Sequence, residues 1–150
     1  MRLLIQKVKN AKVLVSGSEV GKIGIGLLVF QGVEDLDSQK DIEWLINKII
    51  NLRIFTDSKN IMNLSVKDID GEILVVSQFT LMASIKKGNR PSYTKASGHD
   101  FAKFMYEKFI KDLTRVYGKK VDSGIFKANM EVELINDGPT TIWIDSKDKQ

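Results

Sequence analysis

The chain of 150 residues contains no cysteine and a single histidine. The absence of cysteine excludes disulfides, thiolate metal sites and a cysteine nucleophile. Because His99 is the only histidine, a metal site built from several histidines is excluded. For the same reason, we do not expect a hydrolase of this composition to use an ordinary Ser-His-Asp catalytic triad. No apolar run approaches the roughly 20 residues that span a bilayer. We therefore expect no membrane association, no cofactor and no metal, although an all-carboxylate magnesium site stays open.

The bulk composition is that of an ordinary globular protein. Hydrophobic residues make up 43% of the chain and charged residues 28%, and the formal net charge is +4. The opening residues 1–7 become polar too quickly for a signal peptide and alternate as a strand does. We expect one domain over residues 1–150, located in the cytoplasm.

Hydrophobic periodicity predicts an α+β fold with a largely antiparallel, barrel-like sheet and two main helices. Ser38 and Asp41 have the spacing of a capping box at the start of one helix, and Gly118 marks the end of the other. The second helix has an apolar stripe that includes Phe101, Phe104, Met105, Leu113 and Tyr117. The expected strands cover 1–8, 11–20, 21–33, 53–55, 72–79, 127–135 and 140–144, and the expected helices cover 38–52 and 99–117.

Gly138 and Pro139 interrupt the last two apolar runs. Proline cannot donate to a central ladder, so the strand pattern must break here. A Gly-Pro bond has only a small trans preference, and a cis bond would direct the Gly138 carbonyl unusually. Both interpretations stay open: a rigid pair of carbonyls that reads a ligand's shape, or a simple turn.

Residues 77–81, Ser-Gln-Phe-Thr-Leu, follow the most continuous apolar run. Ser77 and Thr80 are weak nucleophiles without a neighbouring base, so they are better suited to donate hydrogen bonds to a substrate or an oxyanion. Gln78 offers both a donor and an acceptor. The alternative is that these hydroxyls only cap a strand end.

Two further features have a plain and a functional interpretation. Residues 84–98 contain Lys86, Lys87, Arg90 and Lys95 without an acidic residue, which is either a solvated loop or a surface that attracts a polyanion. His99 starts the second helix, where the helix dipole disfavours a charged imidazole. We expect it to be a surface or capping residue, with a catalytic role as the alternative.

Taken together, these segments resemble the D-aminoacyl-tRNA deacylases. The paired signature is residues 77–81 with Asn136, Asp137, Gly138, Pro139 and Thr141. The likeness extends over nearly the whole chain, through residues 1–6, 51–55, 62–66, 87–92 and 124–130. One departure is Thr140, where the family commonly has valine; we expect local retuning and no new activity.

The resemblance implies a homodimeric enzyme that hydrolyses the ester between a D-amino acid, or glycine mischarged on tRNA(Ala), and the 3′ end of tRNA. The Gly-cisPro pair of one subunit would enter the site of the other and exclude L-amino acids, while the terminal 2′-hydroxyl of the RNA assists hydrolysis. Carried over, Gly138, Pro139, Asn136 and Thr141 belong to the chiral filter, and Ser77, Gln78, Phe79 and Thr80 form the catalytic pocket. Phe126 and Met130 would flank the adenine, and Lys86, Lys87, Arg90, with Arg2 or Lys7, would meet tRNA phosphates.

Two alternatives remain at this point. The chain could be a non-catalytic RNA- or DNA-binding module that uses the basic stretch. It could also be a relative that edits L-alanyl-tRNA, with the same fold and a roomier pocket.

Overall fold

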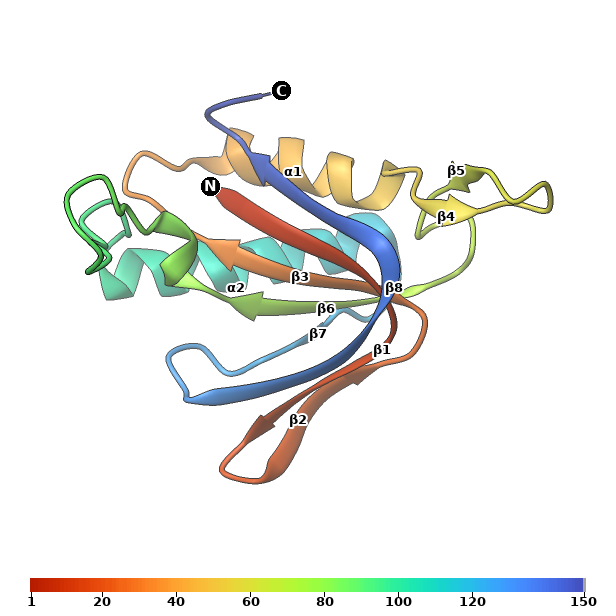
Figure 1. Cartoon of the computed structure of the whole chain (residues 1–150), viewed down its shortest axis with the longest axis horizontal. Helices are drawn as coiled ribbons and strands as arrows, with labels where there is room; N and C mark the ends of the chain where they lie inside the picture. The colour runs from red at the N-terminus through yellow and green to blue at the C-terminus, as the bar shows by residue number, and fades with distance from the viewer. Residues whose placement is uncertain (150) are drawn as a thin grey trace.

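The computed structural model describes residues 1–149 and shows a curled sheet with two helices packed on one side (Figure 1). The strands are β1 (Arg2–Val15), β2 (Ser18–Ile23), β3 (Gly26–Gly32), β4 (Phe55–Thr56), β5 (Met62–Leu64), β6 (Glu72–Ser77), β7 (Asp122–Ser123) and β8 (Met130–Asp145). The helices are α1 (Gln39–Asn51), the short 3-10 helix η1 (Phe79–Met82) and α2 (His99–Tyr117).

The main sheet is mixed, with the order β2-β1-β3-β6-β7 and β8 paired to β1. β1 pairs antiparallel with β2, β3 and β8, whereas β3–β6 and β6–β7 are parallel pairs. β1 and β8 bend together, so that the two halves of the sheet curl toward each other (Figure 1). The predicted α+β class, barrel-like sheet and two main helices are confirmed.

Two apolar clusters hold this arrangement together. The larger one joins the sheet to both helices through fully buried side chains such as Leu3, Leu45 and Phe109. The smaller one fills the inside of the curl and includes Val13 and Leu74. Burial of this apolar surface is the main favourable contribution to folding.

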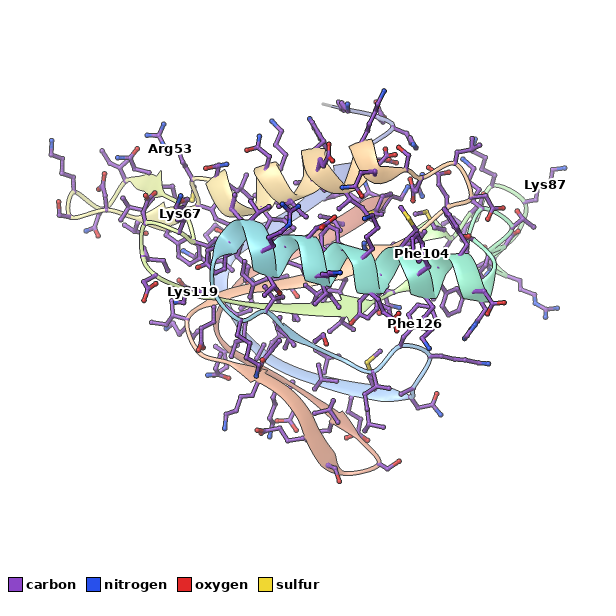
Figure 2. All side chains as sticks on the ribbon, turned by 180° about the vertical axis from the view of Figure 1, so that it is seen from behind. Arg53, Lys67, Lys87, Phe104, Lys119 and Phe126 are labelled. Carbon is purple, nitrogen blue, oxygen red and sulfur yellow. The ribbon has the colours of Figure 1, made fainter. Side chains whose placement is uncertain are left out.

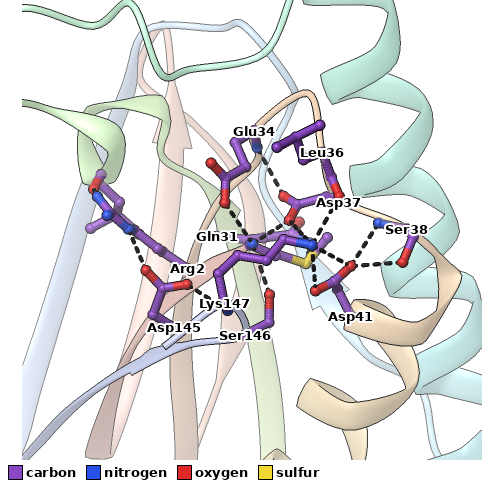
Figure 3. A network of polar contacts seen from close by, with 12 residues as sticks. Arg2, Gln31, Glu34, Leu36, Asp37, Ser38, Asp41, Asp145, Ser146 and Lys147 are labelled. Carbon is purple, nitrogen blue, oxygen red and sulfur yellow. Dashed lines mark hydrogen bonds and ion pairs between the residues drawn. The ribbon is translucent and has the colours of Figure 1, made fainter. Parts of the chain in front are cut away.

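The predicted helix ends are confirmed. Ser38 is the N-cap of α1, and its capping box with Asp41 is present. Asp41 also accepts hydrogen bonds from the Lys147 ammonium at 2.9 Å, which ties the start of α1 to the C-terminal segment (Figure 3). Gly118 ends α2 in the left-handed conformation, with φ of 78°.

Several predicted boundaries are wrong. Residues 1–20 do not form two strands separated at Asn10, because β1 runs through that residue and the turn comes at Ser16 and Gly17, both with positive φ. β8 is likewise one strand from Met130 to Asp145, and not two separated by a turn. Its break in pairing is a bulge, in which residues 137–140 lie opposite Lys7 alone.

The predicted apolar stripe of α2 is wrong at two positions. Phe101 and Phe104 are 38% and 59% exposed. The buried face consists of Met105, Tyr106, Phe109, Asp112, Leu113 and Tyr117.

Candidate functional site

The segment that follows β6 is held close to β3. The main-chain N–H of Gln78 donates to the carbonyl of Gln31 at 2.7 Å, which continues the parallel pairing for one more bond. The chain then turns into η1, which passes directly over Gly32. A Cβ at Gly32 would lie 3.0 Å from the Cβ of Leu81 and 3.1 Å from the carbonyl oxygen of Gln78. Glycine at this position therefore allows η1 to sit where it does.

Beside η1 lies a cavity of about 590 Å³. Ser77, Gln78 and Phe79 line one part of its wall, and Phe126 and Met130 line another. The structure thus brings together five of the residues selected from the sequence. The cavity wall therefore contains hydroxyl, amide and aromatic groups and the thioether of Met130. Such a lining suits a ligand that has both a polar part and a flat apolar part.

Thr80 is not among the residues that line this cavity. Its hydroxyl oxygen instead accepts a hydrogen bond from the side-chain amide of Gln78. The two side chains therefore orient each other, and this bond connects Thr80 to the cavity wall.

Tyr106 of α2 forms a part of the cavity wall that the sequence did not point to. Its hydroxyl donates to the carbonyl of Val75 at 2.9 Å, and its ring packs against Phe126 with centroids 5.7 Å apart. Burial raises the pKa of Tyr106 to about 12, so the phenol stays protonated at neutral pH. Its helical spacing from Phe109 and Leu113 was the available signal for a buried position.

His99 also lines the cavity, in addition to starting α2. Its ring meets Phe126 edge-on with centroids 5.3 Å apart, and its Nδ1 lies 3.1 Å from a carboxylate oxygen of Asp100. Its side chain is 46% exposed, which confirms the expected surface position, whereas the N-cap of α2 is Gly98 and not His99.

The Gly138-Pro139 pair lies in the bulge of β8, and the bond between the two residues is cis. The side-chain amide of Asn136 donates to the carbonyls of Lys7 at 3.1 Å and Thr140 at 3.0 Å. Both Gly138 and Pro139 are exposed, and neither lines the cavity beside η1. Within this chain the two signature segments therefore do not form a common site.

Neighbouring side chains fix the bulge further. The Lys7 ammonium pairs with Asp137 at 3.1 Å, and the Thr141 hydroxyl accepts from the Gln6 amide at 3.2 Å. Thr140, the departure from the family pattern, is buried, and its hydroxyl lies 3.9 Å from the sulfur of Met62.

The basic stretch forms an exposed loop. Ser84 and Ser92 exchange two main-chain hydrogen bonds of 2.8 and 2.9 Å and close it. Lys86, Lys87 and Arg90 are exposed between them.

Arg2 and Lys7, the other two cations considered for phosphate contacts, are engaged elsewhere. The Arg2 guanidinium binds Asp145 at 2.8 Å and the carbonyl of Leu81 at 3.0 Å. The Lys7 side chain is 7% exposed, so the expectation that it meets a phosphate is wrong.

Across residues 1–149, no group of three or more histidine, cysteine, aspartate or glutamate side chains is placed to hold a metal ion. In the same range, no helix has the length and apolar character needed to cross a membrane.

Comparison with known proteins places the chain in a family. The family described as D-Tyr-tRNA(Tyr) deacylase matches residues 4–145. D-aminoacyl-tRNA deacylases from Flavobacterium johnsoniae and Flavobacterium psychrophilum are 57% and 58% identical over 150 residues, which is all of this chain and all of each relative. A solved structure named c-Myc DNA Unwinding Element Binding Protein superposes with a TM-score of 0.92 at 38% identity, covering 97% of this chain and 98% of the other. The chain belongs to the D-aminoacyl-tRNA deacylase family, and it is a hydrolase.

Proposed function

We propose that the chain hydrolyses the ester that joins a D-amino acid to the 3′ end of tRNA. The observation that carries the proposal is the cavity in which Ser77 and Gln78 share a wall with Phe126 and Met130. An aromatic ring and a thioether suit the flat face of an adenine base. Hydroxyl and amide groups suit the ester and the ribose. The terminal adenosine and its aminoacyl group therefore fit one cavity.

The cavity offers positioning groups, and His99 is the one imidazole among the residues that line it. Its titratable side chains are His99, Tyr106 and Lys127. The pKa of Tyr106 is raised to about 12 by burial, so this phenol is not a base at neutral pH. We assign proton transfer to the 2′-hydroxyl of the substrate's own ribose. Water then adds to the ester carbonyl carbon, the carbon–oxygen bond to the ribose breaks, and the ribose oxygen leaves with a proton.

Selection against L-amino acids is assigned to the exposed bulge of a second copy of the chain. Gly138 and Pro139 would enter the partner's cavity and exclude any side chain on the L face of the α-carbon. A main-chain carbonyl makes no use of the substrate's side chain, so many D-amino acids should be accepted. Glycine has no side chain to exclude, which extends the proposal to glycyl-tRNA mischarged on tRNA(Ala).

The outer edge of β8 supports a dimer. Within residues 1–149 this strand pairs with β1 alone. Ile135 and Trp143 on it are 53% and 49% exposed. A long edge strand with exposed apolar side chains is a surface that natural proteins usually cover.

The experiment compares release of amino acid from four substrates by the purified chain. We expect release from D-tyrosyl-tRNA and from glycyl-tRNA(Ala), and none from L-tyrosyl-tRNA or L-alanyl-tRNA. No release from D-tyrosyl-tRNA would contradict the proposal. Release from L-alanyl-tRNA alone would instead identify an editing enzyme for L-alanine.

A second candidate is nucleic-acid binding without catalysis. The exposed loop with Lys86, Lys87 and Arg90 favours it, and one structural neighbour is named as a DNA-binding protein. A pure binder would retain D-tyrosyl-tRNA on a filter and leave its ester intact.

A further inference from the structure

Two aromatic rings stand in contact outside the apolar cores. The rings of Phe79 and Tyr93 meet edge-on, with centroids 5.0 Å apart and planes at 67°. Phe79 is 58% exposed and Tyr93 is 39% exposed. Because both rings are partly exposed, an aromatic group of a ligand can stack on them.

The pair connects the cavity to the basic loop. Phe79 is part of the cavity wall, and Tyr93 directly follows Ser92, whose bridge to Ser84 closes the loop that carries Lys86, Lys87 and Arg90. A polymeric ligand that leaves the cavity on this side would therefore pass the two rings before it reaches any other part of the surface. A ligand whose end occupies the cavity would meet Phe79 and Tyr93 with its next unit.

The segment on both sides of Tyr93 is held in place by hydrogen bonds. The Ser84–Ser92 bridge closes the basic loop just before Tyr93, and the N–H of Ala96 donates to the Tyr93 carbonyl at 2.9 Å. Further on, Ser97 donates its N–H to the carbonyl of Val33 at 2.9 Å and its hydroxyl to Asp35 at 2.6 Å. The ring position is therefore largely formed before any ligand arrives, which reduces the entropic cost of binding.

The charge beside the pair indicates what the ligand is. Lys86, Lys87 and Arg90 are exposed, and none of them forms an ion pair with another described residue. In Figure 2, Lys87 extends into solvent from the end of the molecule where α2 begins. A row of such cations next to exposed aromatic rings is the combination that binds single-stranded nucleic acid, through phosphate contacts and base stacking.

We propose that Phe79 and Tyr93 form a stacking site for the nucleotide that precedes the terminal adenosine of a single-stranded RNA 3′ end. This inference rests on the proposed function, because that function places the terminal adenosine in the cavity. The phosphate between the two nucleotides then faces the basic loop. Through this site the enzyme distinguishes aminoacyl-tRNA from an aminoacyl ester of adenosine alone.

The test compares two substrates of different length, D-tyrosyl-tRNA and the 2′(3′)-D-tyrosyl ester of adenosine. Tyr93→Ser removes the ring, and Tyr93→Phe keeps it. Stacking contributes roughly 1–3 kcal/mol per base, so Tyr93→Ser should lower kcat/KM for D-tyrosyl-tRNA about 5- to 150-fold, mostly through KM. For the adenosine ester, kcat/KM of Tyr93→Ser should stay within about twofold of the value for the parent protein. Tyr93→Phe should have the parent's kcat/KM for D-tyrosyl-tRNA, because it keeps the ring.

Phe104→Ser is the matched control. Phe104 is an exposed phenylalanine of α2 that does not line the cavity (Figure 2). This variant should leave both substrates unaffected.

Three outcomes would count against the stacking site. Equal losses on both substrates in Tyr93→Ser would mean that the ring only supports the shape of the cavity. Unchanged rates on both substrates would mean that no nucleotide stacks there. A parent protein that cleaves neither substrate would overturn the proposed function, and the stacking site with it.

Discussion

The side-chain amide of Asn136 donates a hydrogen bond to the main-chain carbonyl of Lys7, at 3.1 Å. The side-chain ammonium of Lys7 forms an ion pair with the carboxylate of Asp137, at 3.1 Å. One residue of β1 therefore holds two consecutive residues of β8 at the start of the bulge. The position of Gly138 and Pro139 is set by these contacts, and not only by the chain between them.

The first prediction concerns Asn136→Ala. The change removes the side-chain amide that donates to the carbonyls of Lys7 and Thr140, so the bulge loses two hydrogen bonds that hold it in place. The free energy of unfolding should fall by about 1–2 kcal/mol. Because small misplacements near a reacting group are costly, the ratio of kcat/KM for D- over L-tyrosyl-tRNA should fall by about tenfold. Kinetics with both enantiomers and urea unfolding check the two effects.

Glu133→Gln is the control for this variant. Glu133 lies on the same strand and forms an exposed ion pair with Lys12 at 2.9 Å, which contributes little to stability. An unchanged enantiomer ratio in Asn136→Ala, with reduced stability, would show that the bulge does not select the substrate.

The second prediction tests whether the bulge enters a partner's cavity. A Cβ built on Gly138 meets only the side-chain oxygen of Asn136, at an ordinary 3.5 Å, so Gly138→Ala fits within its own protomer. We expect unchanged unfolding by urea. If the bulge enters the other subunit's cavity, the added methyl group crowds the substrate, and kcat/KM for D-tyrosyl-tRNA should fall by about tenfold or more. Full activity would place the bulge outside the site.

Local chemistry explains which parts of the fold the sequence predicts. The start of α1 follows from Ser38 and Asp41, and the end of α2 from Gly118, because capping is decided by a few neighbouring residues. The strand before η1 follows from the apolar run that becomes β6. Ser77, at the end of β6, follows from the same apolar run, whereas Phe126 and Met130 were expected only from the family resemblance and Tyr106 was not expected.

Tertiary pairing explains what the sequence does not predict. Asn10 is a poor strand residue, yet β1 continues through it because Ile135 of β8 lies opposite. The bulge at residues 137–140 depends on how β8 follows the bend of β1, and nothing local specifies that bend. Phe104 has the spacing of a core residue, but the sheet and α1 leave that side of α2 uncovered.

The third prediction concerns Gly32→Ala. The new methyl group would lie 3.0 Å from the Cβ of Leu81 and 3.1 Å from the carbonyl oxygen of Gln78, so η1 must shift by a few tenths of an ångström. The free energy of unfolding should fall by about 1–3 kcal/mol, as for other overpacked sites. Because Gln78 moves with η1, kcat/KM for D-tyrosyl-tRNA should fall by more than the loss of folded protein explains.

Gly24→Ala is the matched control for Gly32→Ala. Its Cβ would meet only the end of the Glu72 side chain, at 3.3 Å, which can move. Equal activities of the two alanine variants at equal folded fraction would contradict a positional role for η1.

The fourth prediction concerns the pH dependence of stability. Burial opposes ionisation of Asp41, but hydrogen bonds from Lys147, Ser146 and Ser38 outweigh it and hold the pKa of this carboxyl below its ordinary value. The ionised carboxylate therefore stabilises the fold above the unfolded pKa of about 3.9, and this stabilisation is lost as pH falls through the lower folded pKa. Asp41→Asn should lower the free energy of unfolding at neutral pH by about 1–3 kcal/mol.

Urea unfolding between neutral pH and about pH 2 checks the sign of this effect. The gap between parent and Asp41→Asn should be largest at neutral pH and narrow below about pH 4. Glu43→Gln, on the exposed side of the same helix, should follow the parent throughout. A gap that widens on acidification would contradict the assignment.

The last prediction separates a positioning hydroxyl from a nucleophile at Thr80. The Thr80 hydroxyl accepts a hydrogen bond from Gln78 and does not line the cavity. Thr80→Val keeps the shape of the side chain and removes this acceptor. If Thr80 only orients Gln78, kcat/KM for D-tyrosyl-tRNA should fall by about 2- to 10-fold, which corresponds to one hydrogen bond of roughly 0.5–1.5 kcal/mol. Loss of a nucleophile would instead lower turnover by several orders of magnitude in a folded protein. Gln78→Ala removes the other partner of the same hydrogen bond. If the double variant loses less kcat/KM than the product of the two single fold-losses, the two side chains act on the substrate as one unit.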